Sequence, residues 1–332
     1  MLDRRRFAAL SSACALDCAL AAVLGPSVAR AQNQPFPTRF VRLVVPFPAG
    51  GGTDAIARVL ANQLSLIWNQ QMVVENKGGG ATSIGTEMVA KSEPDGHTVL
   101  LQSMPLAVNK FLFKTLPYDP VADLAPVSLV CDYPNIMAVP ANSPAHSVKE
   151  FIEYARANPG KATFASSGHG TSVHLSGELF NRMTGLKLLH VPYRGAGPAL
   201  NDLIPGRVDV MFNNTGAVLP LIQGGKLRAL GITSQKRLAV LPDVPTVSEA
   251  GVPGFDVTAW YAMFVPAKTP EPVIRKMHAD TAKAVTDPDT KARLEQLGVG
   301  VIGSSPEELR AHLAAEMAKW GPIIAEAGIK VE

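Results

Sequence analysis

Cysteine is scarce in this sequence, with three residues among 332. Two of them, Cys14 and Cys18, lie in an N-terminal segment with the features of a leader, which leaves Cys131 alone. A single cysteine excludes both an intramolecular disulfide and a cysteine-based metal site. We expect Cys131 to be a small buried core residue.

Net charge is also low. The chain carries 31 basic and 28 acidic residues, and without the first 31 residues the counts are 27 and 26. A chain so close to neutral gives no indication of a nucleic-acid surface or a membrane-binding patch. About 300 residues at this hydrophobic content suffice for two lobes, each with its own core.

Long hydrophobic runs are absent after the N-terminus. Arg4, Arg5 and Arg6 precede an apolar stretch that ends near Val28, and Ala29–Ala31 has the A-x-A form of a cleavage site. This order predicts a secretory signal peptide over residues 1–31, and the arginines also resemble a twin-arginine signal. No other stretch reaches the roughly 18 apolar residues that span a bilayer, so we expect a soluble, exported protein.

Short β-branched segments alternate with longer helical patterns. Phe40–Val45 has the pattern of a buried strand, and Ala55–Trp68 carries apolar residues at helical spacing. The alternation begins again at Asn135–Val139, and helical patterns fill the chain from Glu271 onwards. The predicted fold class is α/β, with two units and a last segment that returns to the first.

The segment Pro46–Asp54 links the first strand to the first helix and contains three consecutive glycines. Glycines permit positive φ and leave N–H groups uncovered, and at a helix N-terminus these groups favour an anion. The segment lacks the lysine of a Walker A loop and the G-x-G-x-x-G spacing, so it suits a carboxylate better than a nucleotide. The alternative is a plain turn with Thr53 as the N-cap. The candidate ligand-binding residues are Phe47, Ala49, Gly50, Gly51, Gly52, Thr53 and Asp54.

A second glycine-rich turn, Gly78–Gly85, contains the candidate Ser83. Ala81–Gly85 differs by one residue from the G-x-S-x-G of a nucleophile elbow, but no histidine partner can be assigned. The other interpretation is a helix start of small residues that packs closely on the first turn.

A third turn, Ser166–His174, repeats this arrangement in the second unit. Its candidate ligand-binding residues are Ser166, Ser167, Gly168, Gly170 and Thr171. His169 and His174 are five residues apart, which does not place them on one helix face, and the H-E-x-x-H pattern is missing. We therefore expect no metal site, and we expect His174 to pack inside its lobe.

Two further turns follow predicted strands. His190–Gly197 offers one cation and an aromatic ring, Tyr193, and Asn213–Gly216 offers neutral polar groups, with Asn213 as the candidate. In an open α/β sheet the turns after the strands share one crevice. Because no acid–base pair emerges, we expect neither a catalytic site nor a cofactor.

Short segments of distinctive amino-acid sequence are distributed over nearly the whole chain. They are Arg42–Asp54, Val74–Gly80, Pro94–Thr98, Gly168–Thr171, His174–Glu178, Val191–Gly195, Gly206–Asp209 and Asp243–Gly251. In content and order they resemble the Bug-type substrate-binding proteins of the tripartite tricarboxylate transporter family.

The resemblance implies a two-lobed periplasmic-binding-protein fold of the Venus-flytrap, type II-like kind, located in the periplasm. Residues 32–131 and 256–332 would form domain I, and residues 132–255 domain II. A ligand carboxylate would lie between Ala49–Thr53 and Ser166–Thr171, partly held through ordered water, while Asp54 caps the helix.

The implied partners are a small carboxylate (a di- or tricarboxylate, an amino acid or an aromatic acid) and the membrane subunits of a transporter. The chain itself would be a monomer and not an enzyme. Two other functions stay open: a secreted serine hydrolase that uses Ser83 or Ser167 with a histidine, and a sensor partner that signals ligand occupancy. A ring-bearing ligand could contact Phe47, Tyr193 or Trp260, each also an ordinary packing residue.

Overall fold

The computed structural model describes residues 36–331, and the residues from Arg39 onwards form one compact unit, to which this account refers. The predicted signal peptide, residues 1–31, lies outside the described residues. None of the helices described has both the length and the apolar character that crossing a bilayer requires.

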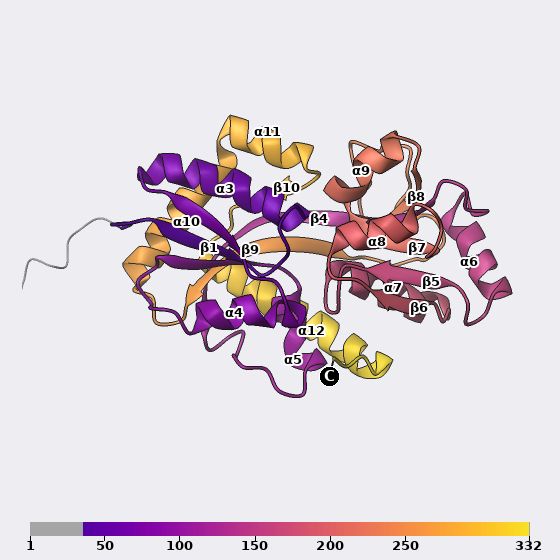
Figure 1. Ribbon diagram of the computed structural model, residues 1–332, viewed down its shortest axis with the longest axis horizontal. Coiled ribbons are helices and arrows are strands. Elements are labelled where there is room, and N and C mark those ends of the chain that lie inside the picture. Colours follow the sequence, from indigo (N-terminus) through magenta and orange to yellow (C-terminus); the bar gives the residue numbers. More distant parts are fainter. Residues whose placement is uncertain (1–35, 332) are drawn as a thin grey trace, which may run out of the picture. The chain divides into compact units, whose positions relative to one another are not determined.

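Strands and helices alternate over most of the unit (Figure 1). The strands are β1 (Val41–Val45), β2 (Met72–Asn76), β3 (Thr98–Gln102), β4 (Leu124–Pro140), β5 (Thr163–Ser166), β6 (Leu189–Pro192), β7 (Val210–Asn214), β8 (Leu227–Ile232), β9 (Thr258–Pro266) and β10 (Gly300–Val301). The helices are α3 (Gly52–Trp68), α4 (Ser83–Ala90), α5 (Pro105–Leu112), α6 (Val148–Ala157), α7 (Ser172–Thr184), α8 (Ala196–Leu203), α9 (Thr215–Gln223), α10 (Glu271–Thr286), α11 (Pro288–Gln296) and α12 (Pro306–Ala327), with a short 3-10 helix η1 (Gly80–Thr82).

The first lobe, as we use the term, contains β1, β2, β3, β9, β10 and the first part of β4. Its strand order is β2-β1-β3-β9-β4, in which β1 pairs in parallel with β2 and β3 while β9 is antiparallel to its neighbours. Parallel neighbours need a crossover connection, and α3 and α4 supply it. Leu43, Val44 and Val45 are fully buried, as expected for a strand covered on both faces.

The second lobe contains the last part of β4 with β5, β6, β7 and β8. β4 pairs antiparallel with β7 and β8, and β5 pairs in parallel with β6 and β7. The buried residues Ile136, Ala165, Met211, Leu203 and Val218 form part of its core. As in the first lobe, each parallel strand ends where a helix begins.

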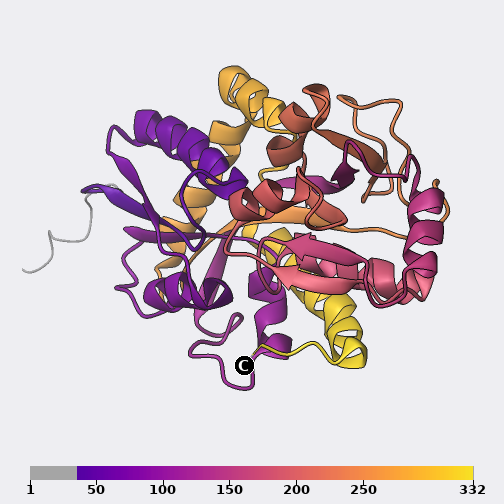
Figure 2. The ribbon, with the colours of Figure 1, turned by 45° about the vertical axis from the view of Figure 1, so that its right-hand side comes forward.

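Two segments cross between the lobes. β4 is one strand of 17 residues that pairs with β9 in the first lobe and with β7 and β8 in the second. The return crossing leads into β9, which in Figures 1 and 2 runs in orange through the middle of the unit. Thr233 joins the two crossings, since its hydroxyl accepts from the Asn135 amide (2.8 Å) and donates to the Val257 carbonyl (2.7 Å).

Candidate ligand-binding site

The glycine-rich turn after β1 is held in shape by Asp54. The Gly50 amide and Arg58 Nε each donate a hydrogen bond to Asp54 Oδ2 at 3.0 Å. Burial by itself would raise the pKa of Asp54, but the hydrogen bonds from Arg58 and Gly50 outweigh it and hold that pKa below its usual value. Oδ2 of Asp54 is therefore bonded within the turn and the helix that follows, whereas its buried Oδ1 has no hydrogen-bond partner among the described residues.

The turn delivers the start of α3 without a side-chain cap. Gly51, and not the predicted Thr53, is the N-cap residue, and the Thr53 hydroxyl instead donates to Tyr261 Oη (3.0 Å). Gly50 has a φ of 80°, which glycine adopts without strain. The first amides of α3 have no carbonyl partner inside the helix, so they are available to an acceptor outside it.

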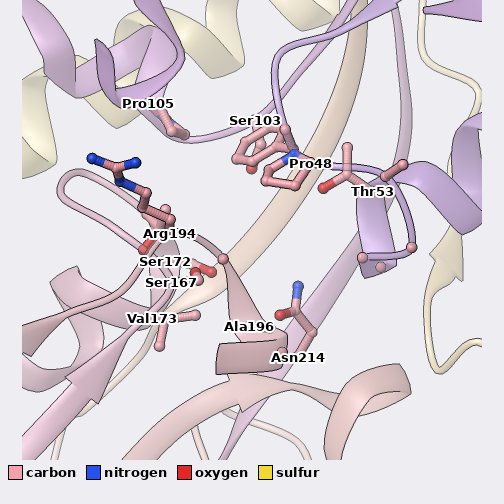
Figure 3. Close-up of a pocket in the computed structure, with 18 of the residues that line it drawn as sticks. Pro48, Thr53, Ser103, Pro105, Ser167, Ser172, Val173, Arg194, Ala196 and Asn214 are labelled. Carbon is pink, nitrogen blue, oxygen red and sulfur yellow. The ribbon is translucent and has the colours of Figure 1, made fainter. Parts of the chain in front are cut away.

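A pocket of about 180 Å³ lies against this turn, between the two lobes (Figure 3). Its lining residues are Phe47, Pro48, Ala49, Gly50, Gly51, Gly52, Thr53, Ser103, Pro105, Tyr133, Ser167, Thr171, Ser172, Val173, Arg194, Gly195, Ala196, Gly197, Pro198, Asn214 and Tyr261. Figure 3 shows Ser167 and Ser172 together on the second-lobe wall, across the pocket from Ser103 and Pro48.

Four helices begin at this pocket. Gly52 starts α3, Ser172 starts α7, Ala196 starts α8 and Asn214 precedes α9, and all four residues line the pocket. Each helix follows a strand, so the carboxyl edges of both sheets face the same space. Since a helix N-terminus carries roughly half a positive charge, the four ends together favour an anion.

The floor of the pocket is a pair of tyrosines on the two crossing strands. The rings of Tyr133 on β4 and Tyr261 on β9 stack with centroids 4.9 Å apart. Tyr261 Oη accepts from Thr53 Oγ1 of the first lobe and from Asn214 Nδ2 of the second (3.4 Å). Burial raises the pKa of both phenols, so they remain neutral hydrogen-bonding groups.

Formal charge in the pocket is of one sign. Arg194 is the charged residue of the lining set, and neither Asp nor Glu is among the residues described there. Arg194 is exposed, and within residues 36–331 it makes no hydrogen bond or ion pair. Its guanidinium lies near Pro105 at one end of the pocket, away from Thr53 and Asn214 (Figure 3).

The structure brings eight of the predicted site residues together around the pocket. They are Phe47, Ala49, Gly50, Gly51, Gly52, Thr53, Ser167 and Thr171. Thr171 is also the N-cap of α7, where its hydroxyl accepts from the His174 amide (3.3 Å) and donates to the Gly168 carbonyl (2.7 Å).

The other seven predicted residues stand outside the lining. Ser83 starts α4, and Gly170 packs against Leu112 of the first lobe. Tyr193 Oη donates to Asp202 (2.7 Å), and Asn213 is fully buried and accepts from the Asn214 amide (2.8 Å).

Asp54, Ser166 and Gly168 are the remaining three predicted residues outside the pocket lining. Asp54 is bonded within its own turn, and Ser166 is fully buried with its hydroxyl 2.6 Å from His190 Nε2. Gly168 accepts the hydrogen bond from Thr171.

Several lining residues were not among the sequence candidates. Arg194 and Asn214 lie in turns that the sequence does indicate, each one position after the residue chosen. Tyr133 and Tyr261 lie on strands, where a pattern of buried residues gives no sign that a side chain faces a ligand. Trp260, a candidate for ring contact, is buried and donates to Glu316 (3.1 Å).

Three histidines lie together behind the second-lobe loop. His174 is buried, as the sequence analysis expected, and its ring stacks on His190 with centroids 4.1 Å apart, while His169 meets both rings edge-on. One ring nitrogen of each lies within 4.8 Å of the others. Imidazole lone pairs lie in the ring plane, so two stacked rings do not aim at one ion, and the cluster instead supports the loop.

At two of the places where the lobes touch, the second lobe contributes a glycine. A Cβ added to Gly195 would lie 3.7 Å from Pro48 Cγ, and one added to Gly216 would lie 2.7 Å from the Leu297 carbonyl oxygen. Gly195 and Gly216 belong to the second lobe, whereas Pro48 and Leu297 belong to the first. The second-lobe backbone therefore approaches the first lobe closely at Gly195 and Gly216.

The second glycine turn packs on the first, as one of its two interpretations predicted. A Cβ added to Gly85 would lie 2.7 Å from the Lys77 carbonyl oxygen and 2.9 Å from Pro46 Cβ. Neither Ser83 nor Ser167 has a hydrogen bond to a histidine in the part of the chain that the structure describes.

Comparison with known proteins gives one consistent result. The pattern of the family described as "Tripartite tricarboxylate transporter family receptor" matches residues 56–329. The chain is 41% identical to the "UPF0065 protein in tcbD-tcbE intergenic region" of a Pseudomonas species, over 92% of each chain.

Solved structures agree with this match. The chain is 37% identical to the periplasmic binding protein BugD (TM-score 0.84, 90% of this chain and 100% of that one). It is 36% identical to R. palustris Rpa4515 with adipate (TM-score 0.86, 89% and 99%) and 33% identical to MatC from Rhodopseudomonas palustris with bound malate (TM-score 0.81, 87% and 100%). The fold is thus the mixed α/β fold of periplasmic binding proteins.

Proposed function

Because the chain belongs to the family of tripartite tricarboxylate transporter receptors, we propose that it captures a small carboxylate in the pocket between its lobes. This family consists of transport receptors, so the chain is a solute-binding protein and not an enzyme. Its ligand would be handed to the membrane subunits of such a transporter.

The observation that carries the proposal is the one-sided electrostatics of the pocket. Four helix N-termini and the unpaired Arg194 border it, and no carboxylate is among its described lining residues. A cation would face the positive ends of these helices and Arg194, with no carboxylate among the described lining residues to pair with. An anion can accept from the free amides of α3 and from the Ser167 hydroxyl, and Arg194 adds a positive charge at one end of the pocket.

We place the carboxylate between the amides of Gly51–Thr53 and the hydroxyl of Ser167, because the Thr171 and Ser172 hydroxyls already donate to the Gly168 carbonyl and to Asn135 Oδ1. Asp54 is not among the lining residues, and its Oδ2 is bonded to the Gly50 amide and to Arg58. The relatives with adipate and malate support this ligand class, since both ligands are carboxylates.

Thermal-shift screening and calorimetry on residues 32–332 test the proposal. Malate, adipate, glutamate and benzoate are compared with glucose, galactose and spermidine. At a hundredfold excess over Kd, a true ligand adds about 2.7 kcal/mol to the free energy of unfolding. Stabilisation by sugars or the cation alone would refute a carboxylate receptor.

Gly51→Val tests the turn directly. Gly51 has extended backbone angles (φ −85°, ψ 173°) that valine adopts, and an added Cβ meets only the Pro48 carbonyl oxygen, at 3.7 Å. The fold should persist while the branched side chain covers the first amides of α3, weakening binding at least hundredfold. Gln71→Val, exposed and remote from the pocket, is the matched control. Unchanged affinity in the Gly51 variant would remove the turn from the site.

We also propose the division into domain I (residues 32–131 and 256–332) and domain II (132–255). Support comes from β4, which changes partners near Asn135, and from β9, which begins at Thr258. Domain closure over the ligand would then be a hinge motion at these two crossings. Hydrogen exchange slowed at both crossings by ligand is expected, and slowing confined to one lobe would argue against this hinge.

We propose that the protein acts in the periplasm as a monomer, after cleavage following Ala31. The sequence of residues 1–31 and the relation to the periplasmic protein BugD support this. Cell fractionation with N-terminal sequencing should find a soluble chain that starts at Gln32. A cytoplasmic, uncleaved chain would contradict the proposal, and sedimentation would settle the monomer.

A further inference from the structure

A second cavity adjoins the pocket on the far side of the glycine turn. Its volume is about 270 Å³, and its walls include Ile56 of α3, Leu200 of α8, and Leu297 and Val299 at the end of α11. We call this cavity the annex. For scale, an engineered apolar cavity of about 150 Å³ holds a benzene molecule.

The annex and the pocket share part of their walls. The residues that line both spaces are Gly50, Gly51, Gly52, Tyr133, Ala196, Gly197, Asn214 and Tyr261. A Cβ added to Gly50 or Gly197 would meet no atom within 4 Å, so space is open beside these two residues. A ligand group that extends past them from the carboxylate position enters the annex.

The annex offers a second carboxylate the first amides of α9 but no charged side chain among its described lining residues. The polar side chains at its edge already have partners: Thr215 Oγ1 donates to the Pro134 carbonyl (3.2 Å), and Asn214 Nδ2 donates to Tyr261 Oη. A charged group there would lose its hydration without gaining a counter-charge.

We propose that the ligand is an asymmetric carboxylate, whose carboxylate occupies the pocket while an uncharged hydrocarbon or aromatic group occupies the annex. This inference rests on the proposed function and narrows it. It separates this chain from receptors for small diacids, because the second carboxylate of a diacid that reached the annex would find no cationic side chain among the described lining residues.

Calorimetry with acids of matched length tests the proposal. From butanoate to hexanoate the affinity should rise about fifteenfold, since each methylene buried in the annex contributes roughly fourfold. Adipate has the same chain length as hexanoate and should bind at least tenfold more weakly. If adipate binds more tightly than hexanoate, Arg194 holds a distal carboxylate and the annex proposal is overturned.

Ala217→Leu fills the annex from α9. It should reduce the hexanoate-to-butanoate affinity ratio to below threefold. A general defect in lobe closure would weaken both acids alike and leave the ratio unchanged. Gln223→Leu, exposed on the same helix and outside the annex, should keep the wild-type ratio.

Leu297→Ala provides a second variant that enlarges the annex and does not depend on fitting a larger side chain. It should shift the best straight-chain acid to a longer chain. If no carboxylate binds the wild-type chain, the proposed function fails. If carboxylates bind but both variants keep the wild-type ratio and length optimum, only the annex proposal fails.

Discussion

Adding one methyl group at Gly216 should weaken ligand binding without lowering the stability of the fold. It lies in the first turn of α9, and a Cβ there would be 2.7 Å from the Leu297 carbonyl oxygen of the opposite lobe. An ordinary contact needs about 3.4 Å, so in Gly216→Ala the lobes must part by about 0.7 Å. Overpacking of this kind costs about 1–3 kcal/mol.

That cost falls on the closed form alone. Within α9, alanine is favoured over glycine by about 0.5–1 kcal/mol, so the unliganded Tm should stay the same or rise. Because 1.4 kcal/mol corresponds to tenfold in Kd, the affinity for a bound carboxylate should fall about 5-fold to 150-fold. Calorimetry gives the Kd, and a thermal scan gives the Tm.

Gln223→Ala is the control, since Gln223 is exposed on the same helix and lies outside the pocket and the annex. Its affinity should stay within about threefold of wild type. Wild-type affinity in Gly216→Ala would show that the lobes do not close through this contact, and a lowered Tm would show that the clash lies within one lobe.

Three further predictions concern the support of the site. Thr233→Val leaves buried backbone groups on both crossings without a hydrogen-bond partner, and it should lower the free energy of unfolding by about 2 kcal/mol or more in a urea titration. A loss under 0.5 kcal/mol would contradict the role of Thr233 in joining the two crossings. Burial and the neighbouring imidazoles lower the pKa of His190 to about 2. The contribution of neutral His190 to the free energy of unfolding should therefore be fully present above pH 6.5. Below that pH the free energy of unfolding should fall by up to about 1.4 kcal/mol per pH unit, whereas His190→Gln should show a shallower slope; equal slopes would refute this. Gly85→Ala drives a methyl against the Lys77 carbonyl and Pro46, and should lower both Tm and affinity; an unchanged Kd would mean that the first turn does not depend on this packing.

The turns of the site could be predicted because their chemistry is local. Three glycines between a strand pattern and a helix pattern require a sharp turn and an open helix start, and Gly50–Thr53 show both. The loop before α7 has the same signature, and the structure places Ser167 and Thr171 across the pocket. The carboxyl edge of a parallel sheet brings such turns together without further information.

The floor of the pocket could not be predicted in this way. β4 contains Pro126, Asp132 and Pro134, which interrupt a strand pattern, so only Asn135–Val139 was expected. The register with β9 shifts near Pro126, where a bulge accommodates the proline.

Other parts of the site depend on contacts distant in sequence. Tyr133 and Tyr261 meet only because β4 and β9 pair, 128 residues apart along the chain. The stacking of His174 on His190 brings together a helix and a separate strand. Neither partner carries a local signal of the other.

The glycine contacts between the lobes have a consequence for how the receptor behaves without a ligand. At Gly195 with Pro48 and at Gly216 with Leu297 the second lobe has no side chain to bury, so these two contacts add little apolar burial to closure without a ligand. The closed conformation then indicates that a ligand is bound, because a ligand that contacts both walls stabilises that conformation. A membrane complex that recognises this conformation would seldom be engaged by receptors that carry nothing.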